Sequence, residues 1–267
     1  MIFLVGGNGF VGSAYARLFT RLGIEYAVIG RRNAEQYRGK ACDLLINANG
    51  NSKKYLADRE PLRDFDDSVA SVARSLDWFH AERYVLLSSG DVYPDTTSPA
   101  RTAEDQVLDP SRQSRYGLHK YLAEILVRGS HPRHLVVRMG GFVGPGLLKN
   151  AIFDMMTGQT LWLHPDSELQ FIQTDTAAEI VYRLVASGVE NQAVNLGATG
   201  RLRLSDAYER IGSTSPLPET APRIVYELDL SRLAKLYGSP LPNSSDEVLR
   251  YIDSVRNSRE ACCASKV

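Results

Sequence analysis

Cysteine is scarce in this sequence. Three cysteines occur among 267 residues, too few for the disulfide framework that stabilises small secreted domains. Cys42 lies at the start of an apolar run and is expected in the core, whereas Cys262 and Cys263 lie in a polar tail. An exposed pair is the simpler interpretation of that tail, and a vicinal disulfide or redox switch is the alternative. This usage favours a cytoplasmic protein.

Net charge and long apolar runs are also lacking. The 31 basic residues balance 31 acidic ones, so the chain has no overall excess of the positive charge that nucleic-acid and anionic-membrane surfaces use. No apolar stretch approaches the roughly 20 residues that cross a bilayer. No charged and apolar leader precedes the first apolar run at residues 1–5. We therefore expect no nucleic-acid partner and no membrane association.

Clusters with the spacing of metal ligands are missing as well. His131 and His134 lie three residues apart, but Pro132 between them interrupts any helix. No nearby cysteine or acidic residue completes a ligand set. The sequence therefore predicts no metal site.

What the chain does contain is an alternation of short apolar runs with segments of helical spacing. This alternation is typical of an α/β protein with a mostly parallel sheet and helices on both faces. We expect strands at residues 1–5, 25–29, 43–47, 83–87, 135–138 and 193–196. We expect helices at residues 10–22, 61–80, 115–128, 174–187, 204–211, 229–237 and 245–255.

A glycine-rich turn joins the first strand to the first helix. Gly6, Gly9 and Gly12 are spaced by three residues in the segment VGGNGFVG. Such a turn needs positive φ, and a pyrophosphate must approach bare backbone N–H groups at the helix N-terminus, which a side chain would block. A merely tight turn is the alternative. Because the turn stands between an apolar run and a helical pattern, it favours dinucleotide binding.

Two arginines follow the second predicted strand. An acidic residue at this strand end would bind a ribose 2′-hydroxyl and favour NAD. Arg31 and Arg32 stand there instead, and a guanidinium group suits a 2′-phosphate. A solvated pair at the start of a loop is the alternative. The sequence thus favours NADP(H) over NAD(H).

A tyrosine and a lysine share one face of the predicted helix at 115–128. Tyr116 and Lys120 are four residues apart, which places their side chains next to each other on a helix. A tyrosine that exchanges protons near neutrality needs its pKa lowered by roughly 3 units, about 4 kcal/mol. An adjacent ammonium contributes to that shift. Ser89 lies just after the strand predicted at 83–87, at the strand edge where ligands bind in parallel sheets.

Together these motifs resemble one family. They are GGNGFVG at residues 6–12, SSGDVYP at 88–94, YGLHK at 116–120 and VVRMGGFVGPG at 136–146. FIQTDTAAEI at 171–180 and AVNLG at 193–197 follow in the same order. The chain resembles the extended short-chain dehydrogenases/reductases, in the NAD(P)-dependent epimerase/dehydratase group that modifies sugar nucleotides. The resemblance spans roughly residues 1–200.

The resemblance implies a Rossmann-type doubly wound fold and a division of the chain. Residues 1–140 would form the NAD(P)-binding Rossmann domain, and 141–257 a small substrate-binding region intertwined with it. Residues 258–267 would be a disordered tail. The helices at 61–80 and 115–128 would pair in a homodimer.

The resemblance also implies a role for each site residue. Tyr116 would exchange the hydroxyl proton, Lys120 would hold the ribose and lower the tyrosine pKa, and Ser89 would bind the reacting oxygen. Hydride would pass between the substrate carbon and the nicotinamide. The expected cofactor contacts are Gly6, Gly9, Phe10, Val11, Gly12, Arg31, Arg32, Ala48, Tyr116 and Lys120.

The sequence departs from the family pattern at three places. Dehydratases carry an acidic pair after the triad serine, whereas this chain has Gly90 and then Asp91; Asp91 is either an acid/base group or a turn residue. Gln170 replaces a basic residue that usually holds a nucleotide diphosphate. Only about a dozen residues separate Ile29 from Asp43, so the usual third strand, its helix and its adenine-contacting Asp are lost or shortened.

Three further residues are candidates for contact with substrate. We expect Trp162 to pack in the core rather than to stack on a base or sugar. Lys149 and Asn150 follow the Gly-Pro-Gly loop, and contact with solvent is favoured over contact with a phosphate.

The expected function is that of an NADP(H)-dependent ketoreductase that acts on a keto group of a nucleotide-linked sugar. A sugar-nucleotide epimerase with tightly retained NAD(P) is the first alternative. The second is a catalytically silent protein that senses NADP(H) and binds a partner.

Overall fold

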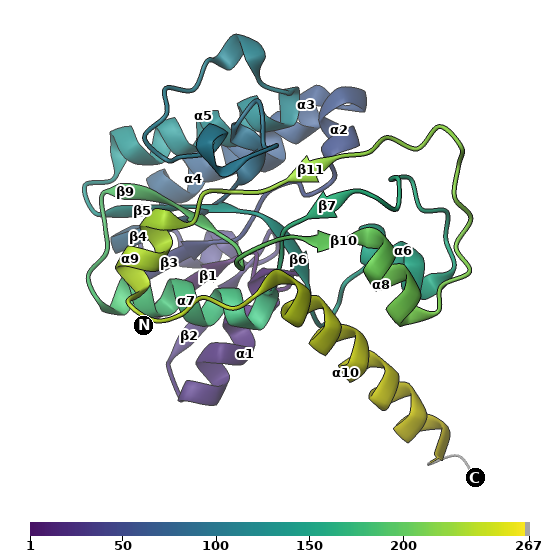
Figure 1. Cartoon of the computed structure of the whole chain (residues 1–267). Helices are drawn as coiled ribbons and strands as arrows, with labels where there is room; N and C mark the ends of the chain where they lie inside the picture. The colour runs from purple at the N-terminus through teal and green to yellow at the C-terminus, as the bar shows by residue number, and fades with distance from the viewer. Residues whose placement is uncertain (265–267) are drawn as a thin grey trace.

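A six-stranded parallel sheet forms the centre of the molecule (Figure 1). The computed structural model describes residues 1–264, and the side chains of residues 1–258. The strand order is β2-β1-β3-β4-β5-β9. The strands are β1 Ile2–Val5, β2 Tyr26–Ile29, β3 Ala41–Asn47, β4 His80–Ser89, β5 His134–Met139 and β9 Gln192–Leu196. Every pairing between them is parallel, which confirms the predicted Rossmann-like fold.

Helices cover both faces of the sheet. One face packs against α1 (Gly12–Leu22), α7 (Thr174–Ala186) and α9 (Ser231–Tyr237). The other packs against α4 (Ser71–Trp78) and α5 (Arg115–Ser130). Because both faces are buried, the strands are continuous apolar runs rather than alternating ones, which is why they were recognisable in the sequence.

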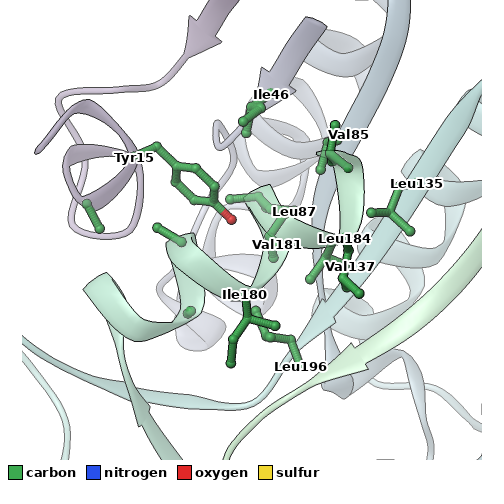
Figure 2. Packing of buried hydrophobic residues seen from close by; sticks show 14 of the residues in the cluster. Tyr15, Ile46, Val85, Leu87, Leu135, Val137, Ile180, Val181, Leu184 and Leu196 are labelled. Atoms are coloured by element: carbon green, nitrogen blue, oxygen red, sulfur yellow. The ribbon is translucent and has the colours of Figure 1, made fainter. Parts of the chain in front are cut away.

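The two faces have separate cores. In β1, Ile2 and Leu4 face α1 and α7, whereas Phe3 faces α4 and α5. Figure 2 shows the first core, in which Tyr15 of α1 and Val181 of α7 point toward the strand side chains. This packing fixes α1 and α7 to the strands, and so holds in place the strand ends that carry the candidate site.

The edge of the sheet at β2 is shortened, as the sequence predicted. After β2 the chain makes a 3-10 turn, η1 at Ala34–Tyr37, and then enters β3 on the other side of β1. Within residues 1–264 no strand lies outside β2.

The predicted helix at 61–80 is interrupted. The chain forms α2 (Lys54–Arg59), α3 (Pro61–Phe65), a π-helical turn η2 (Asp66–Ala70) and then α4. The helix ends at Trp78, because the next residues pair with β3 as the start of β4. A π-helical turn widens the helix locally and is common beside functional sites.

A third core lies outside the central sheet. It joins α6 (Ala151–Thr157), α8 (Leu204–Ile211) and α10 (Ser244–Ala264). Short strands link it to the site: β6 Gly141–Val143 pairs with β8 Phe171–Gln173, and β7 Glu168–Leu169 pairs with β10 Leu202–Arg203 and β11 Val225–Tyr226. Strands of two or three residues are too short to show periodicity, and none was predicted. Between these segments, α7 and β9 return to the first core.

Two expectations for this half differ from the structure. Trp162 is 69% exposed rather than packed in the core; it stands in an irregular segment between α6 and β7, where no helix or sheet face covers it. Helix α10 continues to Ala264, because no glycine or proline ends it after Val255, whereas a disordered tail was expected from residue 258. Residues 265–267 of that tail lie outside the described residues. Within residues 1–264, no helix has both the length and the apolar character needed to span a bilayer.

Candidate active site

Ser89 is the last residue of the central strand β4. Its hydroxyl donates to Asp91 Oδ2 at 3.0 Å and accepts from the Asp91 backbone N–H at 3.2 Å. These bonds cap the 3-10 turn η3 (Gly90–Val92) and hold the Asp91 carboxylate beside the serine. Asp91 therefore forms the turn and also presents its carboxylate to the site.

Tyr116 and Lys120 lie in the first turns of α5, as predicted. Ser114 caps the helix by accepting from the Gly117 N–H at 3.1 Å. A Cβ on Gly117 would lie 2.1 Å from the Asp91 carbonyl oxygen, so this glycine lets α5 approach η3 closely. The Lys120 ammonium lies 5.7 Å from the centroid of the Tyr116 ring. The structure thus brings Ser89, Tyr116 and Lys120 together.

Burial determines the charge state of both groups. It raises the pKa of Tyr116, and the negative charge of Asp91 raises it further, while hydrogen bonding with Ser89 opposes the rise. Burial also lowers the pKa of Lys120, against the attraction of Asp64 and Asp91. Tyr116 is therefore a protonated phenol in the protein alone, the form that can donate a proton to a substrate oxygen.

Sequence reasoning missed Tyr226 of β11. A Cβ on Gly90 would lie 2.3 Å from the Tyr226 hydroxyl and 2.8 Å from Leu228 Cδ2. Burial raises the pKa of Tyr226 well above its usual value, and the negative charge of Asp91 adds to this. The space beside Gly90, where a dehydratase would carry an acid, is thus occupied. No local signal marks Tyr226, because the fold brings it to the site from far along the chain.

Lys54 pairs with Asp91, and Lys149 lies near Lys54. The Lys54 ammonium donates to Asp91 Oδ1 at 2.7 Å and lies 5.8 Å from the centroid of the Tyr226 ring. Lys149 donates to the Ser52 carbonyl. Burial lowers the pKa of Lys149 to about 8, and the charges of Lys53 and Lys54 contribute. Lys149 is exposed, as expected, and the loop after Gly146 also brings its ammonium onto the Ser52 carbonyl.

The remaining candidate side chains make hydrogen bonds within the protein. Gln170 is 2% exposed and its Oε1 accepts from the Leu228 N–H at 3.1 Å, so this side chain holds β7 beside the segment after β11. Asn150 caps α6 by accepting from the Phe153 N–H at 3.0 Å. His131 and His134 each bond a backbone carbonyl. Among the described residues no group of His, Cys, Asp and Glu side chains could hold a metal ion.

The glycine turn lies where β1 meets α1. Gly6 has φ +77°, and a Cβ there would lie 2.9 Å from the Ala48 carbonyl carbon. A Cβ on Gly12 would lie 2.3 Å from the Gly6 oxygen. A Cβ on Gly9 would meet only the Gly6 oxygen, at 3.3 Å, within 4 Å, so Gly9 faces open space.

These properties fit a dinucleotide pyrophosphate. Helix α1 begins without a capping side chain and has no acidic residue in its first turn, so the positive end of its dipole faces the turn without a competing carboxylate, which favours an anion there. Ala48 lies beside the turn because its N–H donates to the Val5 carbonyl at 2.9 Å. Phe10 packs on the third core, outside the central sheet, and Val11 on the first.

An acid that the sequence did not reveal stands at the arginine pair. Arg31 donates to Asp67 Oδ1 at 2.7 Å, and Arg32 is exposed next to it. Asp67 belongs to the π-helical turn η2, not to the end of β2 where an acid was sought. A carboxylate and a guanidinium therefore lie together just after the end of β2.

Comparisons with known proteins agree with this geometry. The model of the NAD dependent epimerase/dehydratase family matches residues 2–197. A comparison with curated protein sequences finds no match.

Solved structures share the fold over nearly the whole chain. A UDP-galactose 4-epimerase is 21% identical with a TM-score of 0.78, covering 96% of this chain and 99% of that one. MoeE5 in complex with UDP-glucuronic acid and NAD is 16% identical with a TM-score of 0.80, covering 96% and 99%. RMD from Pseudomonas aeruginosa, complexed with NADPH, is 20% identical with a TM-score of 0.75, covering 95% and 98%.

The family match covers most of the chain and includes the glycine turn, Ser89, Tyr116 and Lys120. The fold is the one that its structural neighbours have. The chain therefore belongs to the NAD dependent epimerase/dehydratase family, whose members are NAD(P)-dependent enzymes.

Proposed function

We propose that this protein is an NADPH-dependent ketoreductase that acts on a keto group of a nucleotide-linked sugar. One observation carries the proposal: a protonated Tyr116 lies between Ser89 and Lys120, and Tyr226 and Leu228 fill the space that a dehydratase acid needs. The loss of one acid of the dehydratase pair argues against water elimination. Proton donation to a carbonyl oxygen remains.

The residues divide into cofactor and substrate contacts. The glycine turn with Ala48 would hold the pyrophosphate, Lys120 the nicotinamide ribose, and Arg31 with Arg32 a 2′-phosphate. The bound cofactor supplies hydride. Ser89 would donate a hydrogen bond to the substrate oxygen, and Tyr116 would transfer its phenolic proton to the same oxygen.

The substrate class has its own support. Structural neighbours are complexes with UDP-glucuronic acid and UDP-glucose. Gln170 is buried and accepts a backbone hydrogen bond, but the ammonium groups of Lys53, Lys54 and Lys149 lie near one another, and Lys54 pairs with Asp91. We assign the diphosphate of the substrate to these lysines.

An epimerase that retains its cofactor is the second candidate. Its support is the likeness to UDP-galactose 4-epimerase together with Asp91, which is hydrogen-bonded to Ser89 and placed to act as an acid/base group. An epimerase oxidises and re-reduces one carbon, so it consumes no NADPH.

Cofactor stoichiometry separates the two candidates. We expect purified protein to carry little nicotinamide, and to oxidise one NADPH for each keto-sugar nucleotide reduced. Bound nicotinamide near one per chain, with UDP-sugar interconversion and no net oxidation, would contradict the reductase.

We also propose a homodimer formed through α5 and the adjacent α3. Leu118, Leu122 and Ile125 share one face of α5 by their spacing, and Ile125 is exposed. Leu62 of α3 is exposed as well. Light scattering on the wild type and on Leu122→Ser tests this: the wild type should have the mass of two chains, and the variant that of one.

A further inference from the structure

A buried carboxylate lies behind Lys120 and takes no part in the triad. Asp64 of α3 is 0% exposed. Its Oδ2 accepts from His119 Nδ1 at 2.5 Å and its Oδ1 from Asn51 Nδ2 at 2.7 Å. The Ser68 hydroxyl also donates to Oδ1, at 3.5 Å. Because the carboxylate accepts, the proton of the imidazole is on Nδ1.

The loop after β3 connects this carboxylate to the lysine. Asn51 binds Asp64, and the preceding residue, Gly50, lies against the ammonium: a Cβ on Gly50 would be 2.7 Å from Lys120 Nζ. Gly50 has φ +138°, a conformation that favours glycine. His119 is the neighbour of Lys120 on α5. Asp64 is thus linked to Lys120 in two ways: through Asn51 and Gly50 of the loop, and through His119 of α5. These links fix the distance between the Asp64 carboxylate and the Lys120 ammonium.

The two charges do not touch. Asp64 Oδ2 is hydrogen-bonded to His119 Nδ1, and among the described side chains Lys120 forms no direct ion pair with either acid. Burying an isolated charge is costly unless an opposite charge is near, so the lysine needs a counter-charge. A direct salt bridge would occupy the ammonium hydrogens that a ribose has to bind.

We propose that Asp64, held by His119, is a positioning residue of the active site: it keeps the Lys120 ammonium charged from a distance and leaves its N–H groups free for the cofactor ribose. This role rests on the proposed function, because it presumes that Lys120 meets a nicotinamide nucleotide. It concerns the network behind the lysine and not the triad itself.

The negative charge of Asp64 raises the pKa of both Lys120 and Tyr116. Lys120 faces Asp64 from α3, Asp91 from η3 and Tyr116 on its own helix, and both acids raise its pKa against the effect of burial. Asp64 also raises the pKa of Tyr116. Removing the charge of Asp64 thus lowers the pKa of both groups, while Asp91 remains paired with Lys54.

The first test neutralises the acid in the cofactor-free protein. The rate at which trinitrobenzenesulfonate modifies Lys120, identified by mass spectrometry, is followed against pH. Only the free amine reacts, so the modification rate rises with pH around the pKa of Lys120. Asp64→Asn should move the midpoint of this pH–rate curve to lower pH by about one unit. Asp66→Asn is the matched control, since this exposed acid lies in the same helical segment, and it should leave the midpoint in place. An unchanged midpoint in Asp64→Asn would overturn the proposal.

The second test releases the acid instead of removing it. In His119→Leu the carboxylate loses its donor and can turn onto the lysine, which should move the midpoint to higher pH and weaken NADPH binding about tenfold. His119→Asn keeps a donor near the Nδ1 position and should restore both. A merely structural role predicts lower melting temperatures without these opposite shifts, and that result would also overturn the proposal.

The lysine-modification experiments and the assays of the proposed function can give independent answers. Lysine modification needs neither cofactor nor substrate, so it tests the Asp64 role even if the protein reduces no keto sugar. If Asp64→Asn does not fold, the upward shift in His119→Leu and its reversal in His119→Asn decide. Should the midpoints shift as expected while wild-type protein binds no NADPH, the proposed function fails and the electrostatic arrangement stands.

Discussion

Replacing Gly90 by alanine tests the packing that excludes a dehydratase acid. The new Cβ would lie 2.3 Å from the Tyr226 hydroxyl and 2.8 Å from Leu228 Cδ2, both below ordinary contact distance. Overpacking a buried site costs about 1–3 kcal/mol. Because the tyrosine belongs to a short strand paired with β7, it cannot move away without disturbing that pairing. We expect Gly90→Ala to lose about 2 kcal/mol.

A double-mutant cycle in urea measures how much of this loss comes from Tyr226. Among the described side chains the Tyr226 hydroxyl has no hydrogen-bond partner, and its ring contacts the Lys54 ammonium. Tyr226→Phe alone should therefore cost less than about 1 kcal/mol. In the double variant the closest contact is gone, so the two changes should couple favourably by about 1 kcal/mol.

Gly129→Ala is the matched control for the cycle. Gly129 lies in α5, and nothing lies within 4 Å of a Cβ there, so alanine should stabilise the protein by up to about 1 kcal/mol. Wild-type stability for Gly90→Ala, or strict additivity in the double variant, would refute the reasoning. Either result would mean that the space beside Gly90 is large enough for a substrate group or an acidic side chain.

Three further predictions follow from the site and the core. Tyr116→Phe should lose at least about a hundredfold in keto-sugar reduction while binding NADPH as before; unchanged function would favour the sensing protein. UDP affinity, measured by calorimetry, should fall as pH rises through about 8, where Lys149 loses its charge. Lys149→Gln should bind UDP more weakly at pH 7 and abolish that dependence. Arg138→Met should cost about 3 kcal/mol in urea, because it leaves the fully buried Glu124 without its bidentate partner.

The sequence was most informative where the chemistry is local. Tyr116 and Lys120 meet because they are four residues apart on one helix, and the glycine turn works within seven residues. The parallel strands were visible because burial on both faces makes them continuously apolar. Such features need no knowledge of how distant segments meet.

Residues that meet only through the fold were not predictable. Tyr226 reaches Gly90 from a two-residue strand, Asp64 reaches His119 across a helix pair, and Asp67 reaches Arg31 from a π-helical turn. No period or motif signals any of these. Trp162 was misplaced for a related reason, since its size favoured burial while no element covers it.

The most direct test of the account is a fluorescence titration of the protein with NADPH and NADH. We expect NADPH to bind at least tenfold more tightly, a difference of about 1.4 kcal/mol. Arg31→Ala should erase this preference, and Arg38→Ala, an exposed arginine paired with Glu35, should keep it. Equal affinities, or tighter NADH binding through Asp67, would contradict an NADPH-dependent reductase; binding of neither cofactor would contradict the enzyme altogether.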